Sequence, residues 1–179
     1  MTTSPPPRRP PVRSRDALGR PLPPGTAGVA PLELPAALPP PAALAAAQHL
    51  LDTGLPFQAH EVLEAAWKSA GDDDRALWRA LTQLAVGLTQ LARGNVPGGL
   101  TVLARAAEGL TPYADGHLHG VDAAGLVRWC EHTARAALDG RLAITDSTAT
   151  DLSRPGGNGA PADDPSSATV ALRPPRLVR

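Results

Sequence analysis

Residues 56–93 read PFQAHEVLEAAWKSAGDDDRALWRALTQLAVGLTQLAR, and this stretch decides the fold class. In both halves apolar residues recur three and four positions apart, which is the period of an amphipathic helix. Proline at position 56 begins the first half and Gly71 ends it, while the aspartates at 72–74 suit the positive end of a second helix. The stretch therefore predicts two consecutive helices that bury their apolar faces.

Three further segments have the same period, over residues 42–53, 96–110 and 123–139. Asn95 and Asp122 precede the last two and are typical helix N-caps. No segment shows strand-like alternation. Placing the sequence around Gly54 on that around Gly94 superimposes similar apolar residues at an offset of about forty. The sequence therefore predicts an all-α, compact bundle of about five helices, built from two helix hairpins plus a C-terminal helix.

The two ends of the chain have a different composition. Residues 1–40 are rich in Pro and Arg and are expected to form an extended or disordered arm, and residues 141–179 a disordered tail. The helical domain is accordingly placed at 41–140. An alternative is that apolar residues of the ends dock on this domain, as an extended strap in the arm and as a short contact in the tail: Leu18, Leu22, Leu32 and Leu34, and Val170, Leu172 and Leu177.

Charge and composition exclude several classes of function. The chain has 17 basic and 17 acidic residues and a pI near 7.0, so no basic field favours nucleic acid. No apolar run is long enough to cross a membrane. A single cysteine, Cys130, excludes an internal disulfide and fits the reducing cytoplasm. A homodimer is compatible with the small folded size, although nothing in the sequence decides it.

One polar stripe stands out on the apolar face of the predicted helix after Pro56. His60, Glu64 and Trp67 share this face, whereas the paired hairpin has Leu100 and Ala104 in place of the first two. His60 and Glu64 are therefore expected to point inward or to line a semi-buried pocket. Gln58, Glu61 and Lys68 are expected on the solvent side of the same helix.

Three interpretations of His60 and Glu64 remain open. The two side chains pair with each other as a structural contact, because buried polar groups need partners. Alternatively both bind a divalent metal, the one cofactor these residues suggest, with a third ligand among Glu61, His49, His117 and His119. In the third interpretation His60 is a general base whose pKa Glu64 raises.

The next helix adds two candidates to the pocket. Gln83 and Gln90 lie with Arg79 along one edge of its apolar face, and Gly87 between them would allow a neighbour to approach closely. If the two helices pack side by side, these glutamines can meet His60 and Glu64. Trp78 and Trp129 are expected to be packing anchors, and Cys130 is not expected to be a nucleophile.

The stretch from Gly54 to Ala106 resembles the bacterial and archaeal family called domain of unknown function 309, whose signature is HxxxExxW. Here the signature is His60, Glu64 and Trp67, preceded by Phe57 and Ala59 and followed by the Arg93-Gly94-Asn95 connection. The resemblance spans roughly residues 50–110. It implies an all-helical fold, and metal binding by the signature as a proposal, but no reaction.

This chain departs from the family pattern at two places. It has Arg79-Ala80 where members often have Gln-Gly, and Thr89-Gln90 where they often have a histidine that would serve as a third metal ligand.

We therefore expect a small helical protein with a semi-buried His/Glu/Trp pocket of unknown ligand, and whether it is an enzyme stays open. One alternative is a metal-dependent hydrolase that uses His60 and Glu64. The other is a helix-hairpin module that binds a protein partner.

Overall fold

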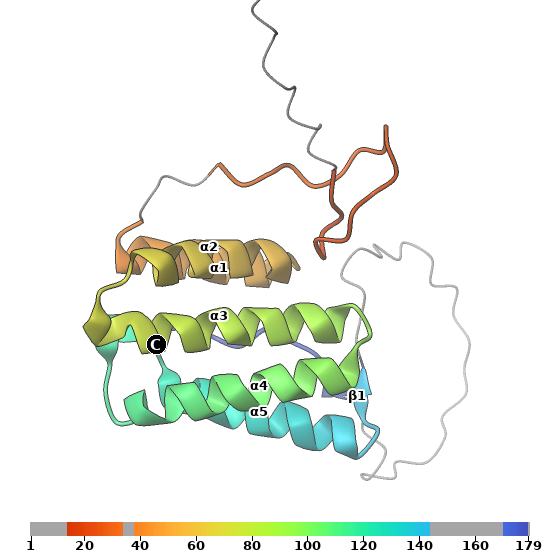
Figure 1. Ribbon diagram of the computed structural model, residues 1–179. Coiled ribbons are helices and arrows are strands. Elements are labelled where there is room, and N and C mark those ends of the chain that lie inside the picture. The colour runs from red at the N-terminus through yellow and green to blue at the C-terminus, as the bar shows by residue number, and fades with distance from the viewer. Residues whose placement is uncertain (1–13, 34–37, 144–169, 179) are drawn as a thin grey trace, which may run out of the picture.

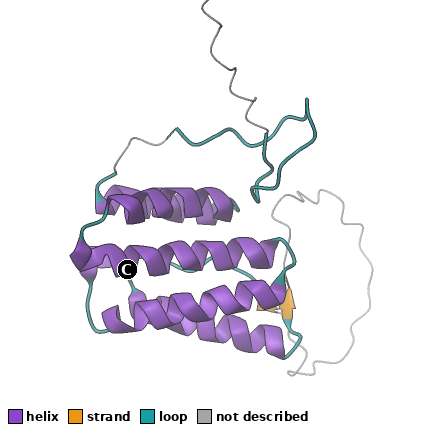
Figure 2. Cartoon of the chain, viewed as in Figure 1, coloured by secondary structure: helices purple, strands orange, loops and turns teal. Residues whose placement is uncertain are grey.

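The computed structural model describes residues 14–33, 38–143 and 170–178 (Figure 1). The predicted all-α class is confirmed, as Figure 2 shows. The described residues form five α-helices, two single 3-10 turns and two strands of two residues each: α1 (Pro40–Asp52), α2 (Pro56–Ser69), α3 (Asp72–Ala92), α4 (Val96–Leu110), η1 (Thr111–Tyr113), η2 (Leu118–Gly120), α5 (Ala123–Leu138), β1 (Leu142–Ala143) and β2 (Val170–Ala171).

The helices begin and end where local chemistry predicts. Asn95 accepts a hydrogen bond from the backbone N–H of Gly98 at 3.2 Å, and Asp122 accepts one from Gly125 at 3.1 Å. Both are therefore N-caps, as expected. Gly94 follows α3 with a φ of +80°, a left-handed conformation that glycine adopts without a steric penalty.

The helices pack in the order of the chain. α1 contacts α2, α2 contacts α3, α3 contacts α4, and α4 contacts α5. Figure 1 shows α3 between the α1–α2 pair and the α4–α5 pair. A β-carbon on Gly87 would lie 2.7 Å from the side chain of Leu103, so this glycine permits the close approach of a neighbouring helix, and that helix is α4. None of the helices in the described ranges has the length and apolar character of a membrane span.

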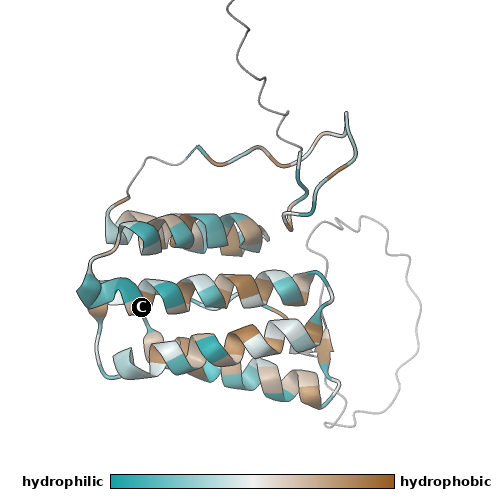
Figure 3. Ribbon diagram, in the orientation of Figure 1, coloured by the Kyte–Doolittle hydropathy of each residue, from teal (hydrophilic) through white to brown (hydrophobic). Residues whose placement is uncertain are grey.

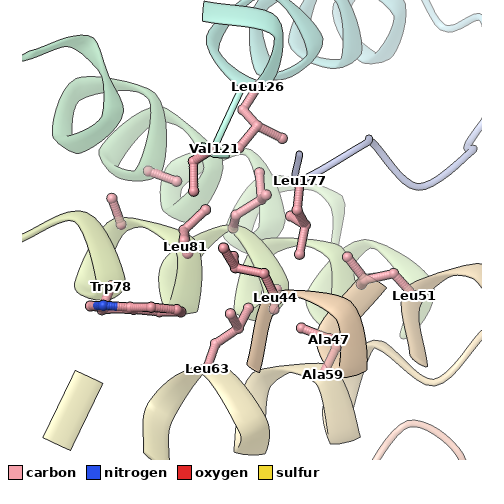
Figure 4. Close-up of a cluster of buried hydrophobic side chains, with 14 of the residues drawn as sticks. Leu44, Ala47, Leu51, Ala59, Leu63, Trp78, Leu81, Val121, Leu126 and Leu177 are labelled. Atoms are coloured by element: carbon pink, nitrogen blue, oxygen red, sulfur yellow. The ribbon is translucent and has the colours of Figure 1, made fainter. Parts of the chain in front are cut away.

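A single hydrophobic core lies between the helix layers. In Figure 4 side chains of α1, α2, α3 and α5 converge, among them Leu44, Leu63, Leu81 and Leu126. Hydrophilic and hydrophobic colours alternate along the helices in Figure 3, as expected for amphipathic helices packed on such a core. Trp78 is 2% exposed, which confirms it as a packing anchor.

The last described segment, residues 170–178, contributes to this core. Leu177 is fully buried, and its backbone N–H donates to the Gln48 side chain at 2.7 Å, while its carbonyl accepts from the Asp122 N–H at 2.9 Å. Trp129 donates to the Arg173 carbonyl at 3.0 Å. β1 and β2 pair in parallel, a contact that the sequence analysis did not expect. Residues 170–178 therefore pack on the helices, which is the alternative to a disordered tail given in the sequence analysis.

The N-terminal strap, residues 14–33, also packs on the helices. Leu18 is buried, and its carbonyl accepts hydrogen bonds from the Arg93 guanidinium. Gly19 lies against the Phe57 ring so closely that a β-carbon would be 2.4 Å away. The docked strap is thus the alternative that the structure shows for these residues, while Leu34 lies outside the described part of the chain.

The strap overturns one expectation about α2. Gln58 was placed on the solvent side, but it is 8% exposed and its amide donates to the Ala30 carbonyl of the strap at 2.8 Å. The helical period assigned the correct face, and the strap then covers that face.

Candidate functional site

His60 lies on α2, half-buried, with its ring centroid 5.9 Å from that of Phe57. Its Nδ1 atom is buried and has no hydrogen-bond partner among the described residues. Burial lowers the pKa of His60 below the usual value for histidine, and the charges of Glu64 and Glu61 oppose this effect. The imidazole is therefore neutral near pH 7.

Glu64 pairs with Lys68 rather than with His60. Its Oε1 lies 3.2 Å from the lysine Nζ, and the two side chains are 34% and 66% exposed. Glu64 reaches the half-exposed edge of the apolar face, where a lysine one helical turn later is available. The structural pairing predicted for His60 and Glu64 is not the contact that forms.

The predicted pocket residues separate into different places. Gln90 accepts a hydrogen bond from the Asn95 side chain at 3.1 Å, at the connection between α3 and α4. Trp67 and Gln83 instead meet on the wall of one cleft of about 640 Å³. His60, Glu64 and Gln90 are not part of its lining.

This cleft, which we call the α2–α4 cleft, has walls from three helices. α2 supplies Trp67 and α3 supplies Gln83, while small residues of α3 and α4 line it as well: Ala76, Ala80 and Gly109. A β-carbon on Gly109 would lie 2.9 Å from the β-carbon of Ala80, so the two helices nearly touch at this point. Because no long side chain lies between them, the surface is hollow here.

The remaining lining residues are charged. Arg75 and Arg79 lie one turn apart on α3, Arg105 lies on α4, and Asp72 and Glu108 supply acidic groups. Within the described residues, none of the three arginines forms an ion pair or a hydrogen bond through its side chain. The cleft thus presents three guanidinium groups that have no partner in the described part of the chain, beside an indole and an amide.

The residues proposed as metal ligands do not gather. His49 and His117 are exposed, and Glu61 lines a separate cavity of about 460 Å³ beneath the strap. No group of three or more His, Cys, Asp or Glu side chains that could hold a metal ion exists in the described part of the chain. His60 and Glu64 therefore find no third ligand there.

His119, another of the candidate third metal ligands, is half-buried and paired. Its Nε2 lies 2.8 Å from Oδ2 of Asp74, which also accepts a hydrogen bond from the Trp78 indole at 3.1 Å. The hydrogen bond to His119 is the main cause that holds the pKa of Asp74 below its usual value. His119 adopts a φ of +55°, which is uncommon for a residue with a side chain. Its hydrogen bond to Asp74 links η2 to the start of α3.

Cys130 is buried in α5, and burial raises the pKa of its thiol to about 12. A thiol that stays protonated is a poor nucleophile, as the sequence predicted.

Sequence reasoning missed four charged residues of the cleft: Asp72, Arg75, Arg105 and Glu108. A usable signal existed on α3, because Arg75, Arg79 and Gln83 recur at intervals of four and so form one stripe. No comparable signal pointed to Arg105, since its place opposite that stripe depends on how α3 and α4 cross.

Comparison with known proteins supports the resemblance stated above. No curated protein and no solved structure matches the chain. Residues 44–102 match the model of a family described as Domain of unknown function (DUF309), and they include the His60, Glu64 and Trp67 signature. Over these residues the chain is similar to that family, whose function is not known, and this similarity agrees with its helical fold.

Proposed function

We propose that this protein binds a small organic molecule in the α2–α4 cleft. The observation that carries the proposal is the meeting of Trp67 and Gln83 on one concave surface of about 640 Å³. Small-molecule sites commonly have volumes of roughly 300 to 1,000 Å³, with aromatic surface and a few polar groups that orient the ligand. The cleft has this size and this combination of groups.

The residues of the cleft support binding more directly than they support a reaction. Trp67 offers a flat apolar face, and Gln83 offers both a donor and an acceptor. Ala80 and Gly109, which form the floor of the cleft, are small, so a ligand has room between the helices.

A screen by nuclear magnetic resonance tests this proposal on the whole chain. A fragment library of acids, amines and neutral compounds is added to ¹⁵N-labelled protein, and the Trp67 indole and Gln83 amide signals are followed. We expect a subset of fragments to shift both signals in a saturable way.

A matched pair of variants locates the binding. Ala76→Leu places a larger side chain in the cleft from an exposed helical position, so the fold is preserved while the cleft is filled. Ala104→Leu makes the same change at an exposed position of α4 that does not line the cleft. Binding is expected to be lost in the first variant and kept in the second. Equal binding to both variants, or no fragment that shifts Trp67 and Gln83, would overturn the proposal.

We infer a cytoplasmic location as well. The chain has one cysteine, Cys130, which is a free thiol in the core, and proteins of reducing compartments commonly keep such thiols. Fractionation of cells that express the full chain tests the location, and recovery in the periplasmic or secreted fraction would contradict it.

A further inference from the structure

The charges of the α2–α4 cleft point to a class of ligand, and this inference rests on the proposed function. Arg75, Arg79 and Arg105 contribute three positive charges to the lining, against two negative charges from Asp72 and Glu108. We propose that the cleft binds an organic oxyanion, with its carboxylate or phosphate group held by these arginines and its apolar part against Trp67.

The three guanidinium groups are available to a ligand. Glu108 follows Arg105 by three residues and Asp72 precedes Arg75 by three, spacings at which ion pairs form on helices, yet no such pair exists among the described residues. Elsewhere on the surface an arginine does form an ion pair with a nearby carboxylate: the Arg141 guanidinium lies 2.6 Å from Oδ2 of Asp139. Within the described ranges these guanidinium donors are therefore not used by other residues of the protein.

The helix packing brings two of these arginines to the same place. Ala80 and Gly109 face each other across the floor, Arg79 directly precedes Ala80, and Arg105 lies one turn before Gly109. Since Gly87 on α3 likewise meets Leu103 on α4, the two helices run antiparallel. Arg79 and Arg105 consequently flank one floor from opposite helices.

Guanidinium groups suit oxyanions better than other ligand groups. Their planar N–H donors match the oxygens of a carboxylate or a phosphate, often with two parallel hydrogen bonds. Binding of an anion also relieves the repulsion among three like charges that share a small surface. A cationic ligand would meet this repulsion itself, and a neutral one would leave the arginines unpaired.

The test compares probes that share a benzene ring and differ in the polar group: phenyl phosphate, benzoate, benzyl alcohol and benzylamine. Titration calorimetry on the whole chain at low salt is expected to show binding of at least one of the two anions, roughly tenfold or more tighter than of the alcohol or the amine. The two anions distinguish a phosphate site from a carboxylate site, and binding should weaken as salt is added.

Variants separate the cleft from general attraction to basic side chains. Arg79→Gln and Arg105→Gln should each weaken binding of the preferred anion by roughly tenfold, because each removes charge-assisted hydrogen bonds. Arg128→Gln, an exposed residue of α5 outside the cleft, should leave binding unchanged.

Two results would overturn the inference. One is benzyl alcohol or benzylamine binding as tightly as both anions, and the other is equal loss of anion binding in Arg128→Gln and Arg79→Gln. If neutral or cationic fragments still bind and Ala76→Leu still abolishes that binding, only the oxyanion inference fails. If no fragment of any charge binds the cleft, the proposed function fails with it.

Discussion

Glu64 has His60 one turn before it and Lys68 one turn after it, and the structure pairs it with Lys68. An exposed pair at this spacing is worth about 0.3 to 0.5 kcal/mol. Glu64→Gln should therefore lower the free energy of unfolding by no more than about 0.5 kcal/mol, as measured by urea denaturation. Lys68→Gln should cause the same small loss.

The same variant has a second readout in His60. The charge of Glu64 raises the pKa of His60 against the effect of burial, so its removal should lower that pKa further. Titration of the His60 ring protons by nuclear magnetic resonance measures this change. A stability loss well above 1 kcal/mol together with an unchanged His60 pKa would contradict the pairing described here.

Asp74 carries the clearest dependence of stability on pH. Its pKa is lowered in the folded state, so its contribution is present above the unfolded-state pKa, near 3.8, and is lost as the pH falls through the folded-state value. Asp74→Asn should cost on the order of 1 kcal/mol at pH 7, because it weakens the hydrogen bonds to His119 and Trp78. Urea denaturation of both proteins at pH 7 and pH 3 should show the difference shrink at the lower pH. A difference that is equal or larger at pH 3 would contradict this origin.

Single residues show where sequence reasoning succeeds and where it stops. The period of α2 predicts that His60, Glu64 and Trp67 share one face, because a helix fixes direction from spacing alone. It could not choose between Lys68 and His60 as the partner of Glu64, since both lie four residues away. Nor could it show that Gln58 is buried, because the strap that covers this side chain comes from about thirty residues earlier in the chain.

At the scale of elements, the strap is the part that the sequence described least well. Its contacts use the backbone carbonyls of Leu18 and Ala30, which accept from Arg93 and Gln58. Carbonyls are present at every residue and leave no pattern in the sequence. The helix ends, by contrast, were predicted because Asn95 and Asp122 are side chains with a specific capping chemistry.

Two glycines of the strap allow a matched test of its docking. Gly19 and Gly25 both have positive φ values, +75° and +83°, but a β-carbon would meet the Phe57 ring at Gly19 and would meet nothing at Gly25. Gly19→Ala should therefore loosen the strap, whereas Gly25→Ala carries only the backbone strain that both variants share.

Hydrogen exchange over residues 14–33 measures this loosening. Exchange should rise clearly more in Gly19→Ala than in Gly25→Ala. Equal exchange in the two variants would show that contact with Phe57 does not hold the strap.

At the scale of the whole molecule, a segment far from the helices in sequence contributes to the hydrophobic core between them. Leu177 lies in the core beside α1 and α5, more than a hundred residues from Leu44 and Leu51 (Figure 4). Leu177→Ala should lower the free energy of unfolding by about 2 to 5 kcal/mol, because it leaves a cavity in a closed core. Leu138→Ala, at a residue that is 82% exposed, should change it little. Similar small effects of both variants in thermal or chemical denaturation would place the C-terminal segment outside the core.

The cleft belongs to this scale as well, which explains why the sequence predicted only part of it. Trp67 and Gln83 were expected in a pocket because they lie on the faces where α2 and α3 meet. The hollow itself depends on Ala80 meeting Gly109 across two helices, and Arg105 joins only through that crossing. The spacing of residues within one helix cannot predict which residues of two helices come into contact.

A titration of ¹⁵N-labelled protein with phenyl phosphate shows whether the α2–α4 cleft binds a small ligand. The three tryptophan indoles report from different places: Trp67 lines the cleft, whereas Trp78 is buried in the core and Trp129 lies on α5. We expect the Trp67 indole and the Gln83 side-chain amide to shift together and saturate, while the other two indoles stay nearly unchanged. Saturable shifts that leave Trp67 and Gln83 unmoved, or that move all three indoles alike, would contradict it.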